Sequence, residues 1–227
     1  SFNGLHGIAP RFYTGVEGID RVEVLKGASA LLYGMSPNGS VGGNINYVPK
    51  RAKSGDNQNS VKLTYGEGHQ FAQQIDLGER TKDNKWGVHF TGYHNNGSTS
   101  FKEEKNNTTS TFIGVDRQGS HSRLYLDGGY VYNNIDNPQY RVQFANITAS
   151  NYNADNYIVN YGLPKADHNK KYGLPDTYRH VTEKFGAVRY EYDFSKHLTG
   201  FAAFGMRETK MDYAYNDFRF NKNATNA

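Results

Sequence analysis

The feature that most constrains the fold is a series of segments, from residue 57 onward, in which apolar and polar residues alternate. In the first of them, Val61, Leu63 and Tyr65 alternate with Lys62 and Thr64. Successive side chains of a β-strand point to opposite faces, so this pattern predicts a strand with one apolar and one polar face. Six later segments repeat the pattern, at residues 71–77, 86–91, 111–116, 124–132, 188–192 and 198–210. The chain is therefore predicted to be all-β, with about seven strands after residue 57.

After a short first connection at residues 66–69, the connections between these segments differ in length between the two ends of the strands. Short turns are expected at residues 82–85, 117–120 and 193–197, whereas the connections at 97–107 and 135–180 are longer and polar. Transmembrane antiparallel β-barrels have short turns at one end and longer loops at the other. A mean hydropathy of −0.80 fits such a barrel, because only every second strand residue needs to be apolar. The sequence has no apolar run long enough for a transmembrane helix.

Charged residues within the strands indicate which face would meet the lumen. Asp76, Asp127, Arg189 and Glu191 all fall on the polar faces. A charge facing lipid costs about 2–4 kcal/mol near the bilayer centre, so these faces are expected to line the lumen of a partial barrel. The net charge of +4 is a mild excess and not a clustered basic patch, so no nucleic-acid partner is expected.

The segment before the alternating strands has a different pattern: a strand, a tight turn, a short helical turn, a glycine loop and a second strand. Gly27 permits the turn, and Ser29 is a candidate N-cap for the helical turn. Two catalytic motifs fail here. Residues 27–31 lack the closing Gly of a nucleophile elbow, and no Gly-Lys-Ser/Thr of a phosphate-binding loop follows the glycines at 39–43. We therefore expect no enzymatic role for this segment.

The same segment carries a family resemblance. Its sequence has Glu-Val-Leu-Lys-Gly at 23–27, Leu-Leu-Tyr-Gly at 31–34, Gly-Gly-Asn-Ile at 42–45 and Lys-Arg at 50–51. This pattern resembles the end of the plug domain of TonB-dependent outer-membrane receptors, most closely the ferric-siderophore group. Lys26 stands where that family usually has Arg, and Ala28 where Pro is usual.

The resemblance implies two parts of a larger protein. Residues 1–52 would be the C-terminal part of a small mixed plug domain, and residues 53–227 the N-terminal part of a transmembrane β-barrel. The chain starts without Met and ends in the polar run 221–227, as an internal fragment would.

The implied function is TonB-dependent uptake of a ferric siderophore across the bacterial outer membrane, without enzymatic activity. Outer-membrane lipid would surround the strands, and TonB would act through a plug segment that is not in this chain. Iron would arrive inside its chelator. Because the chain has no Cys and its eight His are scattered, neither a cofactor nor a protein metal site is expected. Two alternatives stay open: import of another bulky nutrient, such as a cobalamin or an oligosaccharide, and a soluble β-sandwich binding module.

Two groups of residues are candidates for ligand contact. Arg11, Phe12 and Tyr13 lie in what the resemblance identifies as the apex loop of the plug, and Arg with aromatic rings suits bulky, anionic, planar ferric chelates. Phe12 and Tyr13 would serve equally well in the plug core. The long connection supplies the second group, in which Tyr-Gly-Leu-Pro occurs twice; its candidates are Tyr140, Tyr161 and Tyr172. A purely structural external loop is the alternative for this group.

A third group is expected to join the plug to the barrel wall. In the family, Arg and Glu of the plug strand pair with charges on the wall, and Arg21 and Glu23 match those positions. Lys26 would make a weaker contact of the same kind, because an ammonium lacks the planar fork of Arg.

Overall fold

The computed structural model describes residues 1–27, 42–55, 59–138, 143–144, 169, 176–215 and 219–220. The helical turn predicted after Ser29 lies outside these residues, as do Tyr140, Tyr161 and Tyr172. Within them, no helix is long and apolar enough to cross a membrane.

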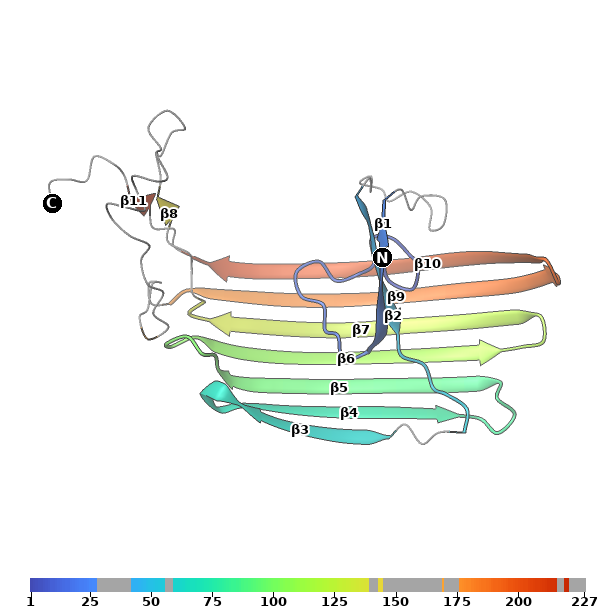
Figure 1. Cartoon of the computed structure of the whole chain (residues 1–227), viewed down its shortest axis with the longest axis horizontal. Coiled ribbons are helices and arrows are strands. Elements are labelled where there is room, and N and C mark those ends of the chain that lie inside the picture. Colours follow the sequence, from blue (N-terminus) through green and yellow to red (C-terminus); the bar gives the residue numbers. More distant parts are fainter. Residues whose placement is uncertain are drawn as a thin grey trace, which may run out of the picture.

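Seven antiparallel strands form one sheet in the order β10-β9-β7-β6-β5-β4-β3 (Figure 1). Apart from the inserted β8, each strand pairs with its neighbour in sequence, which confirms the predicted ladder. The strands are β3 (Ser60–Gly66), β4 (Gln70–Arg80), β5 (Trp86–Ser98), β6 (Lys105–Gln118), β7 (Ser122–Asp136), β9 (Tyr178–Ser195) and β10 (Leu198–Ala214). A short 3-10 turn, η1 (Glu67–His69), joins β3 to β4, and β8 (Gln143–Phe144) pairs in parallel with β11 (Arg219–Phe220).

Several strands are longer than the sequence pattern indicated. The polar loop predicted at 97–107 shrinks to residues 99–104, because β5 and β6 stay paired out to Ser98 and Lys105. Polar side chains on this part of the sheet satisfy one another. Asn133 Nδ2 donates to Thr108 Oγ1 at 2.8 Å, and Asn95 Nδ2 donates to the Gln70 side chain at 3.1 Å. Polar strand ends of this kind continue a ladder without the apolar alternation that reveals it in the sequence.

The face of the sheet opposite the N-terminal segment is an exposed apolar band, with Val61 70% and Phe204 65% exposed. The band runs obliquely across the paired rows. The row that begins at exposed Phe71 on β4 leads to polar His180 on β9, whereas Phe194 and Leu198 extend the band at the short-turn end of β9 and β10. A horizontal membrane would cut tilted strands in this way, and barrel strands tilt by about 35–45°.

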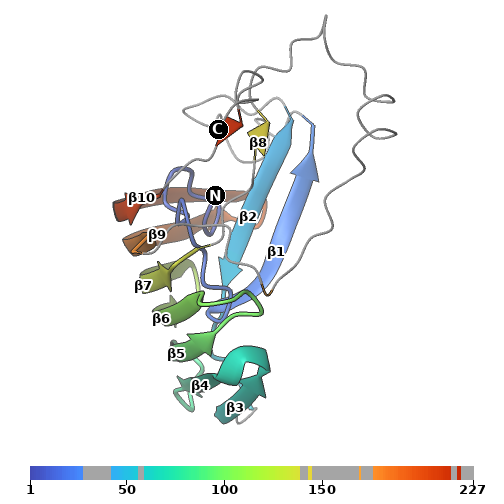
Figure 2. The ribbon, with the colours of Figure 1, turned by 90° about the vertical axis from the view of Figure 1, so that its left-hand side faces the viewer.

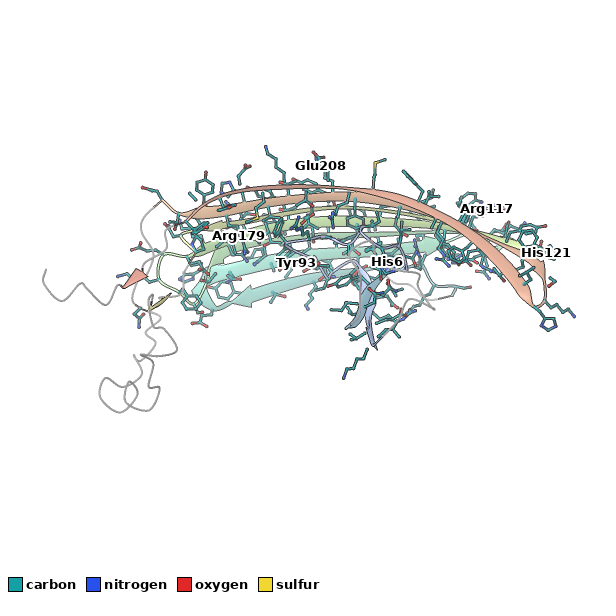
Figure 3. All side chains as sticks on the ribbon, turned by 90° about the horizontal axis from the view of Figure 1, so that it is seen from above. His6, Tyr93, Arg117, His121, Arg179 and Glu208 are labelled. Carbon is teal, nitrogen blue, oxygen red and sulfur yellow. The ribbon has the colours of Figure 1, made fainter. Side chains whose placement is uncertain are left out.

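The N-terminal segment lies against the other, polar face. Its strands β1 (Ile19–Lys26) and β2 (Gly43–Pro49) form an antiparallel pair that crosses the direction of the wall strands (Figures 1 and 2). Gly27 and Gly43 have positive φ where β1 ends and β2 begins, a conformation that favours glycine. Tyr93 lies on the side of this segment, and Glu208 on the outer face (Figure 3).

The hydrophobic core lies between the N-terminal segment and the sheet. The segment contributes Phe2, Ile8 and Ile19, and the sheet contributes Phe112, Val131 and Phe185. Fit at this contact is close. A Cβ placed on Gly18 would come within 2.3 Å of the Phe112 ring, and one on Gly129 within 2.3 Å of the Phe185 ring. The two parts therefore share one packed core, and their relative position is set by side-chain shape.

Candidate functional site

Ion pairs to buried carboxylates tie the end of the N-terminal segment to the sheet. Directly after β2, Lys50 pairs with Asp76 on β4. Next, Arg51 Nη2 lies 2.6 and 2.7 Å from the two carboxylate oxygens of Asp127 on β7. Arg80 then donates from Nε to the carbonyl of Ala52 at 3.0 Å. The sequence therefore placed Asp76 and Asp127 correctly on the face that meets this segment.

Asp76 illustrates how completely the wall surrounds such a carboxylate. His89 Nε2 lies 2.9 Å from one oxygen, and Thr91 Oγ1 donates to the same oxygen at 3.1 Å. Asp76, His89 and Thr91 are all buried. A buried charge that keeps its cation and its hydrogen bonds is tolerated, whereas removing one partner typically costs about 3–5 kcal/mol.

The loop before β1 is held by another buried carboxylate. Glu183 on β9 is 0% exposed. Its Oε1 accepts hydrogen bonds from the backbone amides of Arg11 at 2.9 Å and Phe12 at 3.0 Å, and its Oε2 accepts one from Thr209 Oγ1 at 2.5 Å. Arg207 Nη1 donates to the carbonyl of Ala9 at 2.6 Å. Residues 9–12 are thus fixed to β9 and β10 through their backbone.

The rest of this loop contacts β6. Ser110 Oγ donates to Glu17 Oε2 at 3.2 Å. Tyr13 packs against the shared core, and burial, reinforced by the Glu17 carboxylate, raises the pKa of its hydroxyl. Ser110 and Glu183 lie on the parts of their strands that lead to the longer connections, so the loop lies on that side of the segment (Figure 1).

The three apex-loop candidates therefore fall into two groups, one exposed and one packed. Phe12 is 46% exposed, with the Arg11 guanidinium carbon 5.2 Å from its ring centroid, so these two side chains are available at the surface. Tyr13 instead belongs to the packing beneath them. The alternative given for Phe12 and Tyr13, a place in the plug core, therefore fits Tyr13 and not Phe12.

The candidates for plug–wall contact have other neighbours. Arg21 Nε donates to Glu23 Oε1 at 3.0 Å, and Arg21 Nη1 lies 3.4 Å from Asp20. Glu23 also accepts from Asn46 Nδ2 at 2.9 Å. These contacts lie within the N-terminal segment, and Lys26 ends β1 with its side chain exposed. Wall contact by Arg21, Glu23 and Lys26 stays a prediction.

Two of the charged strand residues behave differently from Asp76 and Asp127. Arg189 Nε donates to Glu191 at 2.7 Å, and Arg123 bridges Glu191 and Asp193 at 2.8 and 2.7 Å. This network lies on the polar face near the short turns, beside the region that the N-terminal segment covers.

Sequence reasoning missed the residues that fix the loop. Glu183 and Arg207 lie on the polar face of their strands, but the strand holding Glu183 was expected to begin near Val188 and begins at Tyr178. One signal was present in the sequence. Phe112 is a large apolar residue at a polar-face position, and such a break in the alternation marks where another part of the protein packs.

The described residues contain no cluster of three or more His, Asp or Glu side chains arranged to hold a metal ion.

Known proteins share this architecture. No protein-family model matches the chain. It is 34% identical over 209 residues to the ferrichrome receptor FcuA of Yersinia enterocolitica, a match covering 90% of this chain and 26% of that protein. The structure of BauA, the ferric preacinetobactin receptor of Acinetobacter baumannii, gives a TM-score of 0.82 at 31% identity, over 95% of this chain and 30% of that one.

A third comparison shows the fold alone. The open form of Fiu, the ferric-catecholate import receptor of E. coli K12, has a TM-score of 0.75 at 21% identity, over 94% of this chain and 32% of its own. The chain thus spans only about a quarter to a third of the length of these relatives.

A tilted, outward-apolar strand wall with a packed segment on its polar face defines part of a plugged outer-membrane β-barrel. Together with these relatives, it shows that the chain is a fragment of a receptor of the TonB-dependent outer-membrane family.

Proposed function

We propose that the receptor containing this chain imports a ferric siderophore across the bacterial outer membrane in a TonB-dependent manner. Residues 1–52 act as the last part of its plug and residues 53–227 as the first part of its barrel. The observation that carries the proposal is the docking of residues 1–52 on the polar face of the wall, with a shared core and ion pairs to buried carboxylates. This is the arrangement that a plugged pore requires.

Ligand recognition begins at the exposed pair in the apex loop. Arg11 supplies a permanent cation with a planar fork, and Phe12 supplies an exposed ring. A ferric siderophore is bulky, often anionic and rich in planar chelating groups, which such a pair suits. Tyr140, Tyr161 and Tyr172, in the long connection, are proposed to form part of the rim that contacts the ligand. Iron stays inside its chelator, so the protein needs neither a metal site nor a cofactor.

The anchored loop gives this recognition a fixed base. Because Glu183 and Arg207 hold the backbone of residues 9–12, the Arg11 and Phe12 side chains extend from a restrained segment. A preorganised contact loses less conformational entropy when ligand binds. Release would then require work on the plug, which TonB supplies through a segment outside this chain. The role is transport, with no catalytic step.

Growth of an iron-starved strain lacking the receptor gene tests the proposal. The strain is fed a panel of purified ferric siderophores, with and without the receptor gene restored. We expect growth on at least one ferric siderophore to depend on the gene. If none does, while growth on a cobalamin or an oligosaccharide does, the receptor imports another nutrient. Dependence on no supplied nutrient would contradict the transport proposal itself.

A further inference from the structure

Arginines lie on both faces of the wall near its short turns, but those on the lumenal face have partners of opposite charge. Arg80 Nη2 lies 2.6 Å from a carboxylate oxygen of Asp116. Arg123 Nη1 lies 2.7 Å from a carboxylate oxygen of Asp193. On the opposite face, Arg117 pairs with none of the described carboxylates. The charge of Arg117 is therefore not neutralised within the described wall.

Arg117 lies on the lipid-facing side of β6, at the short-turn edge of the apolar band (Figure 3). It follows Ile113 and Val115 in two-residue steps, and residues two apart on a strand share a face. It is paired with Trp86 on β5 and with Leu124 on β7. Because strands flank it on both sides, its surroundings on the sheet are complete within the described wall. Short turns mark the periplasmic end of a bacterial barrel.

Trp86 holds the guanidinium at the surface of the sheet. Its side chain is 44% exposed, and the Arg117 guanidinium carbon lies 5.9 Å from its ring centroid, within reach of a cation–π contact. The backbone around the pair is held by hydrogen bonds: the Thr81 amide donates to the Trp86 carbonyl at 2.9 Å, and the Gln118 amide donates to the Lys85 carbonyl at 2.7 Å. Trp is enriched at the level of the lipid headgroups. The pair thus presents a cation at headgroup depth on a restrained part of the sheet.

The chemistry of this pair suits a phosphate ester. A guanidinium offers a planar fork of N–H donors, which two oxygens of one phosphate can accept together. Val88 and Leu126 are exposed one step further into the apolar band, where the acyl chains of the same molecule would lie. A phospholipid can make both contacts at once, whereas a free anion can make only the first.

We propose that Arg117 and Trp86 bind the phosphate of a phospholipid from the periplasmic leaflet, with its acyl chains against the apolar band. The lipid phosphate supplies the counter-charge that the wall does not give to Arg117, and it fixes the depth of β5 and β6 in the membrane. The site lies on the face of the wall opposite to the plug, and it does not depend on the nature of the imported ligand.

Titration of the whole receptor in detergent with a short-chain phosphatidylglycerol, followed by native mass spectrometry, tests the site. We expect Arg117→Gln to weaken lipid binding about tenfold or more, because a charged hydrogen-bonded contact is lost. Arg117→Lys should recover part of the affinity, since it keeps the charge without the fork. Lys85→Gln is the matched control. It removes the same charge at the same end of the wall, from an exposed lysine 3.4 Å from Asp83, and should bind lipid like the wild type.

Two competitors identify what the site recognises. Diacylglycerol with the same chains and inorganic phosphate should each displace the lipid at least about tenfold less well than phosphatidylglycerol itself. Equal affinity of the wild type and Arg117→Gln would overturn the proposal. Equal displacement by diacylglycerol would also overturn it, because acyl chains alone would then explain binding. Equal displacement by inorganic phosphate would reduce the site to one for free anions and overturn the assignment to lipid.

Discussion

The ion pair between Arg51 and Asp127 offers the sharpest test of how the plug is held. In Arg51→Met, Asp127 would remain buried with only the Asn3 amide, 3.3 Å away, as a described polar partner. An unpaired buried charge of this kind costs about 3–5 kcal/mol. Each 1.4 kcal/mol is a factor of ten in an equilibrium constant. Opening of the plug from the wall should therefore become more frequent by a factor of about one hundred to a few thousand.

Native-state hydrogen exchange of the whole receptor in detergent measures this opening. We expect amides of β1 and β2 to exchange faster in Arg51→Met, by the factor above, while amides of β6 and β7 hardly change. Adding Asp127→Leu should restore much of the protection, because replacing both members of a buried pair by apolar residues is often neutral. Arg123→Met is the matched control, because its partners, Glu191 and Asp193, lie on the wall.

Two results would refute this reasoning. One is unchanged protection of β1 and β2 in Arg51→Met. The other is a double variant that exchanges as fast as the single one, since that would assign the effect to lost packing and not to an unpaired charge.

Three further predictions concern packing, lipid exposure and ligand contact. Gly18→Ala should destabilise plug docking by about 1–3 kcal/mol, because the added Cβ would lie 2.3 Å from the Phe112 ring. Gly42→Ala is the control, because the space around Gly42 is open and no destabilisation is expected. The hydrogen-exchange measurement described above compares the two variants. Ile113→Arg places a charge in the apolar band and should make folding into lipid vesicles less favourable by about 2–4 kcal/mol. Thr109→Arg, on the same strand but beyond the band, should make it less favourable by only about 0–1 kcal/mol. Equal costs would contradict the assigned position of the band. Arg11→Ala should weaken ferric-siderophore binding about tenfold or more in a binding titration, and Arg11→Lys should recover only part of it; unchanged binding would remove Arg11 from the site.

Local sequence pattern was sufficient to predict the strand wall. Barrel strands report their facing through every second residue, so the lipid face of β3, with Val61, Leu63 and Tyr65, could be assigned directly. Strand length was not predictable in the same way. Where β5 and β6 continue beyond the apolar band, both faces are polar, and the alternation disappears although the backbone pairing continues.

Contacts between plug and wall were only partly predictable, because they join residues far apart in the chain. Asp76 and Asp127 were found because lipid excludes charge, which leaves the lumen as their only place. Their partners, Lys50 and Arg51, had been noted only as part of the family pattern. Glu183 holds two backbone amides, and backbone donors leave no trace in a sequence.

Phe201 is another residue whose position could not be predicted from local sequence pattern. It interrupts the apolar–polar alternation of β10, because it lies on the face opposite to Phe204 and Met206. In the structure it lies on the polar face, with the Arg189 guanidinium carbon 4.4 Å from its ring centroid. A cation over an aromatic face accounts for an apolar residue among polar neighbours.

Uptake of radioactive iron, supplied as the ferric siderophore identified by growth, tests the central claim most directly. Cells with the receptor are compared with cells lacking it and with cells that have the receptor but lack TonB. We predict that receptor-bearing cells accumulate iron, that cells without TonB bind the chelate at the surface without accumulating it, and that cells without the receptor do neither. Accumulation that needs neither the receptor nor TonB would contradict the account.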